Sequence, residues 1–346
     1  MDESTLIALL KKGAQHKASD VILKVGQPPA FRVNGDLHYL QGDKLRPEQT
    51  LALAEIILRR SRFKGTLEEL TEYDTSYGAQ GVGRYRVNVY RQRGSLAMAL
   101  RAIPLEVPNF EALRLPPAIA KLAENERGMI LCVGAAGNGK STTLAAMVDH
   151  INRSQRVHIV TIEDPIEYMH TDQLASVSQR EIGLDTPHFA TALRAALRQD
   201  PDVILVGEIR DEETMDIALK AAETGHLVLS TLHTPDVART VGRVLALSGS
   251  NSVQETRERF ADNLKGIVAQ RLLPRADGQG RVIAVEVLVM TGTARESIRS
   301  PEGNLPLKDV MERGVHPYGM QTFEMALRDL VKNGLITVET ARAAMG

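Results

Sequence analysis

Residues 130–143 read ILCVGAAGNGKSTT, which is a short apolar run followed by G-x-x-x-x-G-K-S. In this pattern, glycines let backbone N–H groups converge on phosphate oxygens, and the start of the following helix adds partial positive charge. Lys140 is expected to reach the β and γ oxygens, and the Ser141 hydroxyl to bind Mg²⁺. We therefore predict an ATP-binding loop formed by Gly134, Ala135, Ala136, Gly137, Asn138, Gly139, Lys140, Ser141, Thr142 and Thr143. The alternative is a glycine-rich turn without a ligand.

Short apolar runs alternate with helical segments around this loop. The predicted strands are residues 129–133, 157–162, 203–206 and 227–232, and the predicted helices are residues 142–151, 189–198 and 212–223. Such alternation is typical of a parallel sheet with helices on both faces. Asp211 can cap the third helix, and Gly225 can end it. From Val237 onward the pattern favours helices, with one more strand at residues 282–289.

The first hundred residues predict a separate mixed α and β domain. A short helix is expected near residues 6–10, strands at 20–25, 30–33 and 84–91, and a helix at 47–60. Asn34-Gly35 is a strong hairpin signal. Four prolines, at positions 104, 108, 116 and 117, then interrupt regular structure. We therefore predict domains at residues 1–102 and 118–346, joined by a linker at 103–117 where few packed contacts are expected and hinge motion should concentrate.

Composition narrows the class of protein. With 42 Lys and Arg against 43 Asp and Glu, the net charge of −1 gives no general attraction to nucleic acid. Tryptophan is absent and aromatic residues make up 4%, so few rings are available to stack on bases. One cysteine allows no intrachain disulfide and no cysteine-based metal site. No stretch approaches the apolar length of a transmembrane helix, so we expect a cytoplasmic protein without a nucleic-acid partner.

Acidic residues and histidines follow the predicted strands. Glu163 and Asp164 follow one strand, and Glu208 follows the next. Because ligands bind at the carboxyl ends of parallel strands, Glu163 and Glu208 are candidates to serve the nucleotide, whereas Asp164 could equally cap a turn before a proline. His226 and His233 bracket a third strand, and the strand-end position favours His233 as a γ-phosphate sensor.

These segments together resemble one known family. GAAGNGKSTT (134–143), TIEDPIEY (161–168), LRAALRQDPDVILVGEIRD (193–211) and TGHLVLSTLHT (224–234) look like the phosphate loop, Asp box, Walker B and His box of the secretion-superfamily ATPases. The resemblance is greatest to the type IV pilus retraction ATPases of the PilT and PilU group. It extends to ASDVILKVGQPPAFRVNGDL (18–37), GRYRVNVYRQRG (83–94) and MQTFEMALRDLVKNGLIT (320–337), and so spans nearly the whole chain.

The resemblance implies a fold and a set of residue roles. The fold would be α/β, a RecA-like core with a smaller PAS-like N-terminal domain, assembled as a hexamer with ATP between subunits. Glu163 would be the catalytic glutamate and Glu208 the Walker B acid, which would hold Mg²⁺ together with Ser141. The arginines that contact the nucleotide in this group would be Arg86 and Arg101, and the His-box pair would be His226 and His233. Without the resemblance, both arginines would be interpreted as strand residues that face water.

The implied function is a motor that hydrolyses ATP to retract type IV pili in twitching motility. It would lie at the inner membrane through a pilus platform protein, possibly beside a paralogous ATPase. The stretch 296–300 reads ESIRS, with Ser300 where the group has glutamate, so a PilU-like accessory ATPase is an alternative. An extension or type II secretion ATPase is a second alternative, although those relatives commonly carry a tetracysteine site. A non-hydrolysing regulatory subunit is a third.

Overall fold

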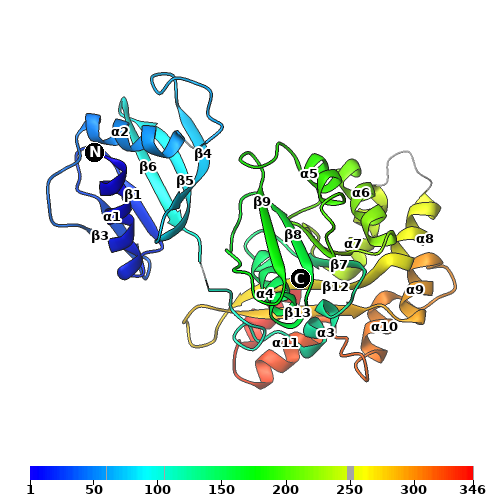
Figure 1. Cartoon of the computed structure of the whole chain (residues 1–346). Helices are drawn as coiled ribbons and strands as arrows, with labels where there is room; N and C mark the ends of the chain where they lie inside the picture. Colours follow the sequence, from blue (N-terminus) through cyan, green and yellow to red (C-terminus); the bar gives the residue numbers. More distant parts are fainter. Residues whose placement is uncertain (60, 105, 248–252, 346) are drawn as a thin grey trace. The chain divides into compact units, whose positions relative to one another are not determined.

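The computed structural model describes residues 1–59, 61–104, 106–247 and 253–345, and the chain divides into two compact units (Figure 1). The division falls between Glu106 and Val107, inside the predicted linker. Two short segments from later in the chain, Pro165–Met169 and Glu181–Pro187, also belong to the first unit, which the sequence pattern does not indicate. Each unit is described separately below.

The first unit is a six-stranded antiparallel sheet in the order β3-β2-β1-β6-β5-β4. Asn34 and Gly35 turn the chain between β2 and β3 with φ angles of 53° and 94°, which confirms the predicted hairpin. The predicted helix at 47–60 begins at Pro47 as expected, whereas Arg60, its predicted end, lies outside the described residues. The elements are α1 (Glu3–Gln15), β1 (Asp20–Leu23), β2 (Ala30–Val33), β3 (Asp36–Tyr39), α2 (Pro47–Leu58), β4 (Glu72–Ala79), β5 (Gly83–Gln92) and β6 (Ser95–Ala102).

The core of this unit follows from the two periodicities of its sequence. Leu6 and Leu10, one turn apart on α1, are fully buried, because side chains four positions apart share a helix face. On β5, Tyr85 and Val87 are buried while Arg86 between them is exposed, as the alternation predicts. The two helices and one face of the sheet therefore share a single apolar cluster.

The second unit contains a seven-stranded sheet in the order β13-β12-β7-β11-β10-β8-β9, with helices around it (Figure 1). Strands β12, β7, β11, β10 and β8 are parallel to one another, which confirms the predicted parallel sheet for this part. The strands are β7 (Gly128–Val133), β8 (His158–Glu163), β9 (Ser176–Glu181), β10 (Val203–Val206), β11 (Leu227–Leu232), β12 (Leu264–Pro274) and β13 (Arg281–Val289). The helices are α3 (Pro117–Ala123), α4 (Lys140–Ser154), α5 (Phe189–Ala196), α6 (Glu212–Glu223), α7 (Val237–Ala246), α8 (Val253–Asn263), α9 (Gly292–Arg299), α10 (Leu307–Arg313), α11 (Phe323–Lys332) and α12 (Val338–Met345).

The prediction of mostly helical structure after Val237 is wrong at β12. This strand of 11 residues pairs in parallel with β7 and antiparallel with β13, so one edge of the sheet is mixed. Its sequence, LKGIVAQRLLP, carries polar residues at Lys265, Gln270 and Arg271 that obscure a strand pattern. Gln270 is nonetheless fully buried, because its amide nitrogen donates to the Thr143 hydroxyl of α4 at 2.7 Å.

The second half of the predicted linker is packed. Leu115 is buried, and Phe110 and Leu113 lie against the core cluster of the second unit. The expectation of few packed contacts over residues 103–117 therefore fails for this part of it. Four prolines do exclude strands and long helices there, but they do not prevent apolar side chains from docking.

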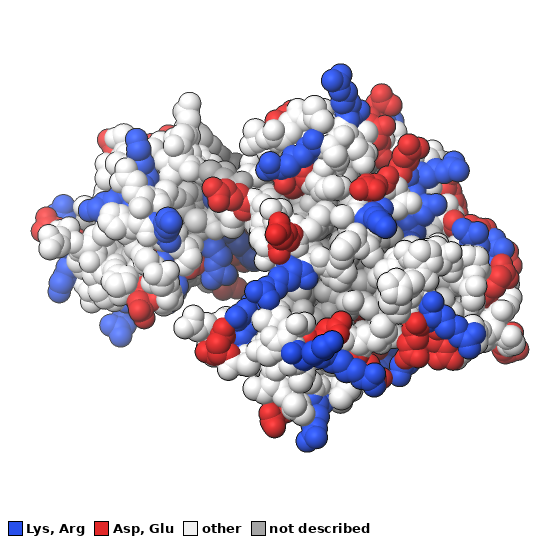
Figure 2. Space-filling view, turned by 90° about the horizontal axis from the view of Figure 1, so that it is seen from below, with Lys and Arg blue, Asp and Glu red and all other residues white. Residues whose placement is uncertain are grey.

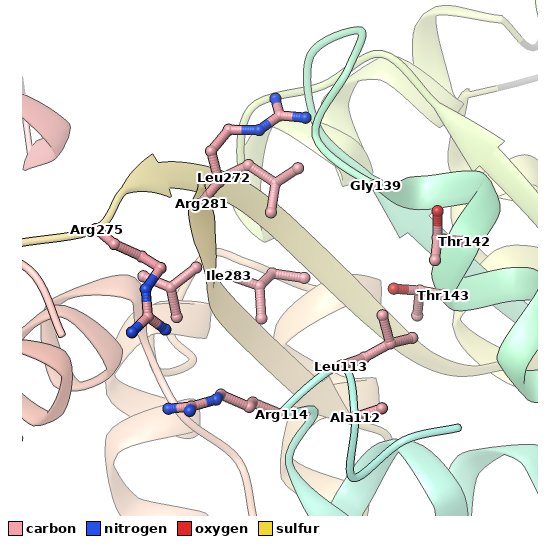
Figure 3. Close-up of a pocket in the computed structure, with 11 residues that line it drawn as sticks. Ala112, Leu113, Arg114, Gly139, Thr142, Thr143, Leu272, Arg275, Arg281 and Ile283 are labelled. Carbon is pink, nitrogen blue, oxygen red and sulfur yellow. The ribbon is translucent and has the colours of Figure 1, made fainter. Parts of the chain in front are cut away.

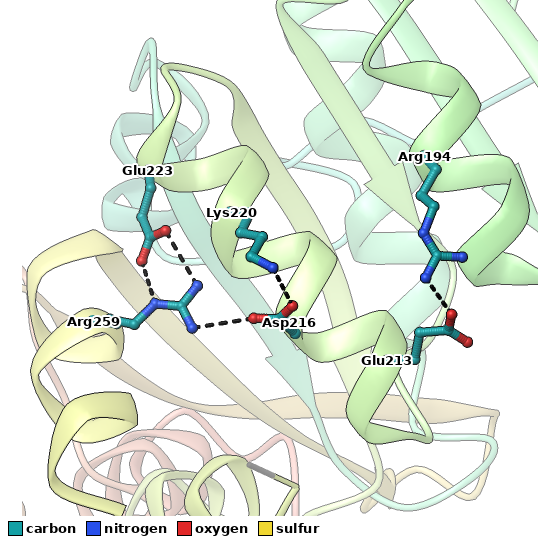
Figure 4. Close-up of polar contacts among 6 residues, drawn as sticks. All are labelled: Arg194, Glu213, Asp216, Lys220, Glu223 and Arg259. Atoms are coloured by element: carbon teal, nitrogen blue, oxygen red, sulfur yellow. Dashed lines mark hydrogen bonds and ion pairs between the residues drawn. The ribbon is translucent and has the colours of Figure 1, made fainter. Parts of the chain in front are cut away.

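Ion pairs tie neighbouring helices of the second unit together. Arg259 of α8 bonds to Glu223 at 2.6 Å and to Asp216 at 3.1 Å, and Lys220 bonds to Asp216 at 2.7 Å (Figure 4). Arg259 is only 19% exposed, so the pairs fix the position of α8 against α6.

Across the face in view, Lys and Arg are interspersed with Asp and Glu (Figure 2). In the described part of the chain, no helix combines the length and apolar character needed to cross a membrane.

Candidate nucleotide-binding and hydrolysis site

The loop between β7 and α4 has the backbone that the glycine pattern predicts. Gly134, Gly137 and Gly139 have φ angles of 148°, 77° and 81°, a region that side chains disfavour. At Gly134 an added Cβ would lie 2.6 Å from the Gln270 carbonyl oxygen of β12. Asn138 closes the other side of the loop, since its Oδ1 accepts the Leu272 N–H at 3.1 Å. The loop is therefore fixed against β12.

Lys140, the first residue of α4, lies inside the curve of this loop. Its side chain is buried, and Nζ donates to the carbonyl oxygens of Gly134 at 2.9 Å and Ala135 at 3.0 Å. Ser141 follows it, half-buried, on the first turn of α4. An ammonium group, a helix N-terminus and a glycine-rich backbone in one place form a donor set suited to phosphate oxygens. The residues present therefore fit a nucleoside triphosphate.

Glu208 and His233 meet at the carboxyl edge of the sheet. Glu208 follows the end of β10, His233 follows the end of β11, and the two strands are parallel neighbours. His233 Nε2 lies 3.2 Å from Glu208 Oε2, and Arg210 lies 2.5 Å from Glu208 Oε1. The structure thus brings together two of the predicted site residues.

Glu163 ends β8 at the same edge. Its Oε1 accepts hydrogen bonds from the Thr161 hydroxyl at 2.6 Å and from the Gln179 amide at 3.1 Å. Strands β10 and β11 lie between β8 and β7, so at about 4.8 Å per strand roughly 14 Å of sheet separates Glu163 from the start of the loop. Glu163 therefore shares the edge with Lys140 but does not lie beside it within one chain.

His226 lies at the amino end of β11, on the side of the sheet opposite to the carboxyl ends of the strands. It precedes β11, whereas His233 follows it, so the length of a six-residue strand, about 20 Å, separates the two histidines. Its Nδ1 lies 2.9 Å from the Ala221 carbonyl oxygen and 3.2 Å from the Thr224 hydroxyl, beside the C-terminus of α6. Within one chain the structure does not bring His226 together with the other predicted site residues.

Arg86 and Arg101 are cross-strand partners in the first unit. They lie opposite each other on β5 and β6, 15 positions apart in sequence. Both are exposed, and Arg101 Nε bonds to Asp20 Oδ1 at 2.9 Å. The sheet of the first unit therefore presents the two guanidinium groups as a pair.

A cavity of about 270 Å³ adjoins the loop and was not predicted from the sequence (Figure 3). The start of α4 forms one wall, β12 and β13 form another, and the segment before α3 forms a third. Arg281 extends toward the loop, and its Nη1 lies 3.3 Å from the Gly137 carbonyl oxygen. The lining of the cavity combines apolar side chains with three arginines and two threonines, and comprises Ala112, Leu113, Arg114, Gly139, Thr142, Thr143, Leu272, Arg275, Arg281, Val282 and Ile283.

The donor set also fits Mg²⁺ brought in with a nucleotide. Among the described residues there is no cluster of three or more His, Cys, Asp or Glu that could hold a metal on its own. Mg²⁺ in nucleotide sites needs only one or two protein ligands, because phosphates and water complete its octahedral shell. The Ser141 hydroxyl and the Glu208 carboxylate are of the required type.

Comparisons with known proteins agree with this geometry. Residues 105–339 match the family described as type II/IV secretion system protein. The chain is 41% identical to the type IV pilus ATPase PilU of Pseudomonas aeruginosa, over 99% of this chain and 87% of that protein. It is 40% identical to the pilus retraction ATPase PilT of the same organism, over 99% of this chain and 97% of that protein.

Two solved structures extend the likeness to the fold. The crystal structure of the pilus retraction motor PilT with bound ADP has a TM-score of 0.85 and 44% identity, over 98% of this chain and 96% of that one. The Legionella pneumophila ATPase DotB has a TM-score of 0.83 and 28% identity, over 100% of this chain and 96% of that one. The fold is thus α/β with a RecA-like ATPase core, as the sequence predicts. The chain belongs to the type II/IV secretion system protein family and, within it, to the PilT and PilU group of pilus ATPases.

Proposed function

We propose that this chain is the subunit of a hexameric motor that hydrolyses ATP to retract type IV pili. The observation that carries the proposal is the gathering of the phosphate loop, the Glu208–His233 pair and Glu163 at one edge of the sheet. Near full-length similarity to PilT and PilU supports the same conclusion. The residues gathered at this edge suit an enzyme whose substrate is a nucleoside triphosphate.

The loop would bind the phosphates of the nucleotide, and the adjoining cavity would bind its base. Lys140 and the loop backbone, from Gly134 to Thr143, would hold the β and γ phosphates, while Ser141 and Glu208 would hold Mg²⁺. The cavity beside Thr142 and Thr143 has apolar side chains, among them Leu272, that suit the flat faces of adenine. When bound, Mg²⁺ supplies charge that offsets the phosphates during transfer to water.

The remaining predicted residues would act on the attacking water and the departing phosphate. Glu163 would orient and deprotonate the water as the catalytic glutamate, and His233 would report the γ-phosphate to Glu208. Arg86 and Arg101 would reach the nucleotide, because a planar guanidinium can bond to two phosphate oxygens at once. His226 is kept in this set only as a residue that would act across a subunit boundary, given its place at the other end of β11.

Assembly and location complete the proposal. Six copies would form a ring with ATP between subunits, in the cytoplasm and held at the inner membrane by a pilus platform protein. A paralogous ATPase could share the work, and no nucleic-acid partner is proposed. ATP binding would close the N-terminal domain of one subunit over the neighbouring core, and hydrolysis followed by product release would reopen it.

A PilU-like accessory ATPase is the second candidate. Two observations favour it: the 41% identity to PilU is no lower than the 40% identity to PilT, and Ser300 stands in place of the glutamate of the retraction group. Deletion of the gene separates the candidates. Hyperpiliated, non-twitching cells support a retraction motor, an intermediate defect that appears only under load supports an accessory motor, and bald cells contradict both.

The enzymatic part is tested on the purified full-length chain. Lys140→Ala should abolish ATP binding and turnover, whereas Glu163→Gln should abolish turnover and keep binding, because the amide retains size and one acceptor but cannot accept a proton. Turnover is measured by phosphate release, and binding by displacement of a fluorescent ATP analogue. Equal loss of binding in both variants would contradict the separate roles.

A further inference from the structure

Gln179 of β9 makes a hydrogen-bond chain that ends on Glu163. Its side-chain nitrogen, Nε2, donates to Glu163 Oε1 at 3.1 Å, and its side-chain oxygen, Oε1, accepts the His170 N–H at 2.8 Å. A backbone N–H can only donate, so His170 fixes which end of the amide is the oxygen. The NH₂ end therefore faces Glu163 as a donor, and this orientation does not depend on a free choice of amide flip.

Thr161 supplies a second donor to the same oxygen. It lies two positions before Glu163 on β8, and residues at that spacing share a face of a strand. Its hydroxyl donates to Glu163 Oε1 at 2.6 Å, and the residue is fully buried. Two donors from neighbouring strands thus converge on one carboxylate oxygen, which sets both the position and the plane of the carboxylate.

We infer that Gln179 and Thr161 are positioning residues for hydrolysis, which hold the Glu163 carboxylate in the orientation from which it acts on the attacking water. The inference rests on the proposed catalytic role of Glu163. A carboxylate that rotated freely about its last bonds would present its oxygens correctly for only part of the time, and small misplacements of catalytic groups reduce rates sharply. Neither residue is expected to touch the nucleotide, so neither should contribute to its affinity.

The test uses Gln179→Met and Thr161→Val in the full-length chain, since each replacement keeps nearly the same shape and removes the donor. We expect kcat for ATP hydrolysis to fall about 10-fold in each variant, as for the loss of a hydrogen bond to a charged group, while KM and ATP-analogue affinity change less than about 2-fold. The matched control is Ser178→Ala, one position before Gln179. It removes a 3.1 Å contact with His158 Nε2 in the same strand pair and should leave kcat unchanged.

A second measurement separates positioning from a structural role. In a Glu163→Gln background, adding Gln179→Met should change the residual single-turnover rate less than about 2-fold, because the carboxylate that Gln179 orients is gone. An additional 10-fold loss there, or a rise in KM with kcat unchanged, would overturn the inference. Melting temperatures and circular dichroism of each variant check folding, and Thr161→Val remains informative if Gln179→Met does not fold.

The two proposals fail in different ways. If Glu163→Gln is inactive but Gln179→Met and Thr161→Val turn over at the wild-type rate, the positioning role is refuted and the proposed function stands. If Glu163→Gln turns over normally, the catalytic role of Glu163 is refuted, and the positioning role falls with it.

Discussion

Gly134 at the exit of β7 offers a quantitative test of how the phosphate loop is built. In Gly134→Ala, the new Cβ would lie 2.6 Å from the Gln270 carbonyl oxygen, which is 0.8 Å closer than the 3.4 Å at which ordinary contacts begin. The obstacle is backbone within the β7–β12 pair, so the strands must separate. Overpacking of this kind typically costs about 1–3 kcal/mol, and the positive φ of 148° adds about 1–2 kcal/mol. We expect a loss of roughly 2–5 kcal/mol in the free energy of unfolding.

Gly137→Ala is the matched control in the same loop. Its φ is also positive, at 77°, but no heavy atom lies within 4 Å of the added Cβ, so only the backbone strain of about 1–2 kcal/mol remains. Calorimetry of the nucleotide-free chain should show the transition of the second unit lowered by roughly 4–20 °C in Gly134→Ala and by about 2–8 °C in Gly137→Ala, with Gly134→Ala clearly the more affected of the two. Equal shifts in the two variants would refute the argument that β12 confines the loop at Gly134.

Three further predictions concern the second unit. Leu272→Ala should weaken ATP binding about 10-fold by removing an apolar wall of the cavity and leave inorganic triphosphate affinity unchanged; equal losses for both ligands, in competition with a fluorescent analogue, would show that the cavity does not hold the base. Burial raises the pKa of Glu286, so the folded form binds that proton more tightly and stability should decline as pH rises from about 4.5; Glu286→Gln should flatten this decline in thermal melts, and parallel curves would contradict it. Arg259→Met should cost about 1–2 kcal/mol in urea unfolding, less in high salt, whereas Arg153→Met, at a pair whose arginine is 65% exposed, should cost almost nothing; similar losses would contradict the role of burial.

Local signals in the sequence predicted the elements that carry the site. The strand–loop–helix around Lys140 is confirmed because glycine spacing, an apolar run and a helical pattern all act within fifteen residues. The limits of α6 at Glu212 and Glu223 are confirmed for the same reason, since Asp211 caps it through a 2.8 Å bond to the Thr214 N–H. Such features depend on neighbours in sequence and can be predicted without knowledge of the fold.

The features that sequence analysis missed depend on distant partners. In β12, Gln270 is buried by a hydrogen bond to Thr143, 127 positions away, and Arg271 lies over the ring of Phe323 at 4.2 Å. Neither partner is visible in the pattern of residues 264–274, where Gln270 and Arg271 therefore interrupt the apolar run of a buried strand. The cavity beside the loop was missed for the same reason, because its walls come from three separate parts of the chain. Gln179 likewise becomes meaningful only once β9 lies beside β8.

Strand β12 contacts the phosphate loop on one side and β13 on the other. On the side toward β7 it confines the phosphate loop through Gln270 and Leu272, and on the other it pairs along nine positions with β13, against which α11 lies. We therefore expect a change in loop geometry that displaces β12 to reach the C-terminal helices through this one strand. Substitutions in the C-terminal helices should therefore be tested for their effect on nucleotide affinity as well as on assembly.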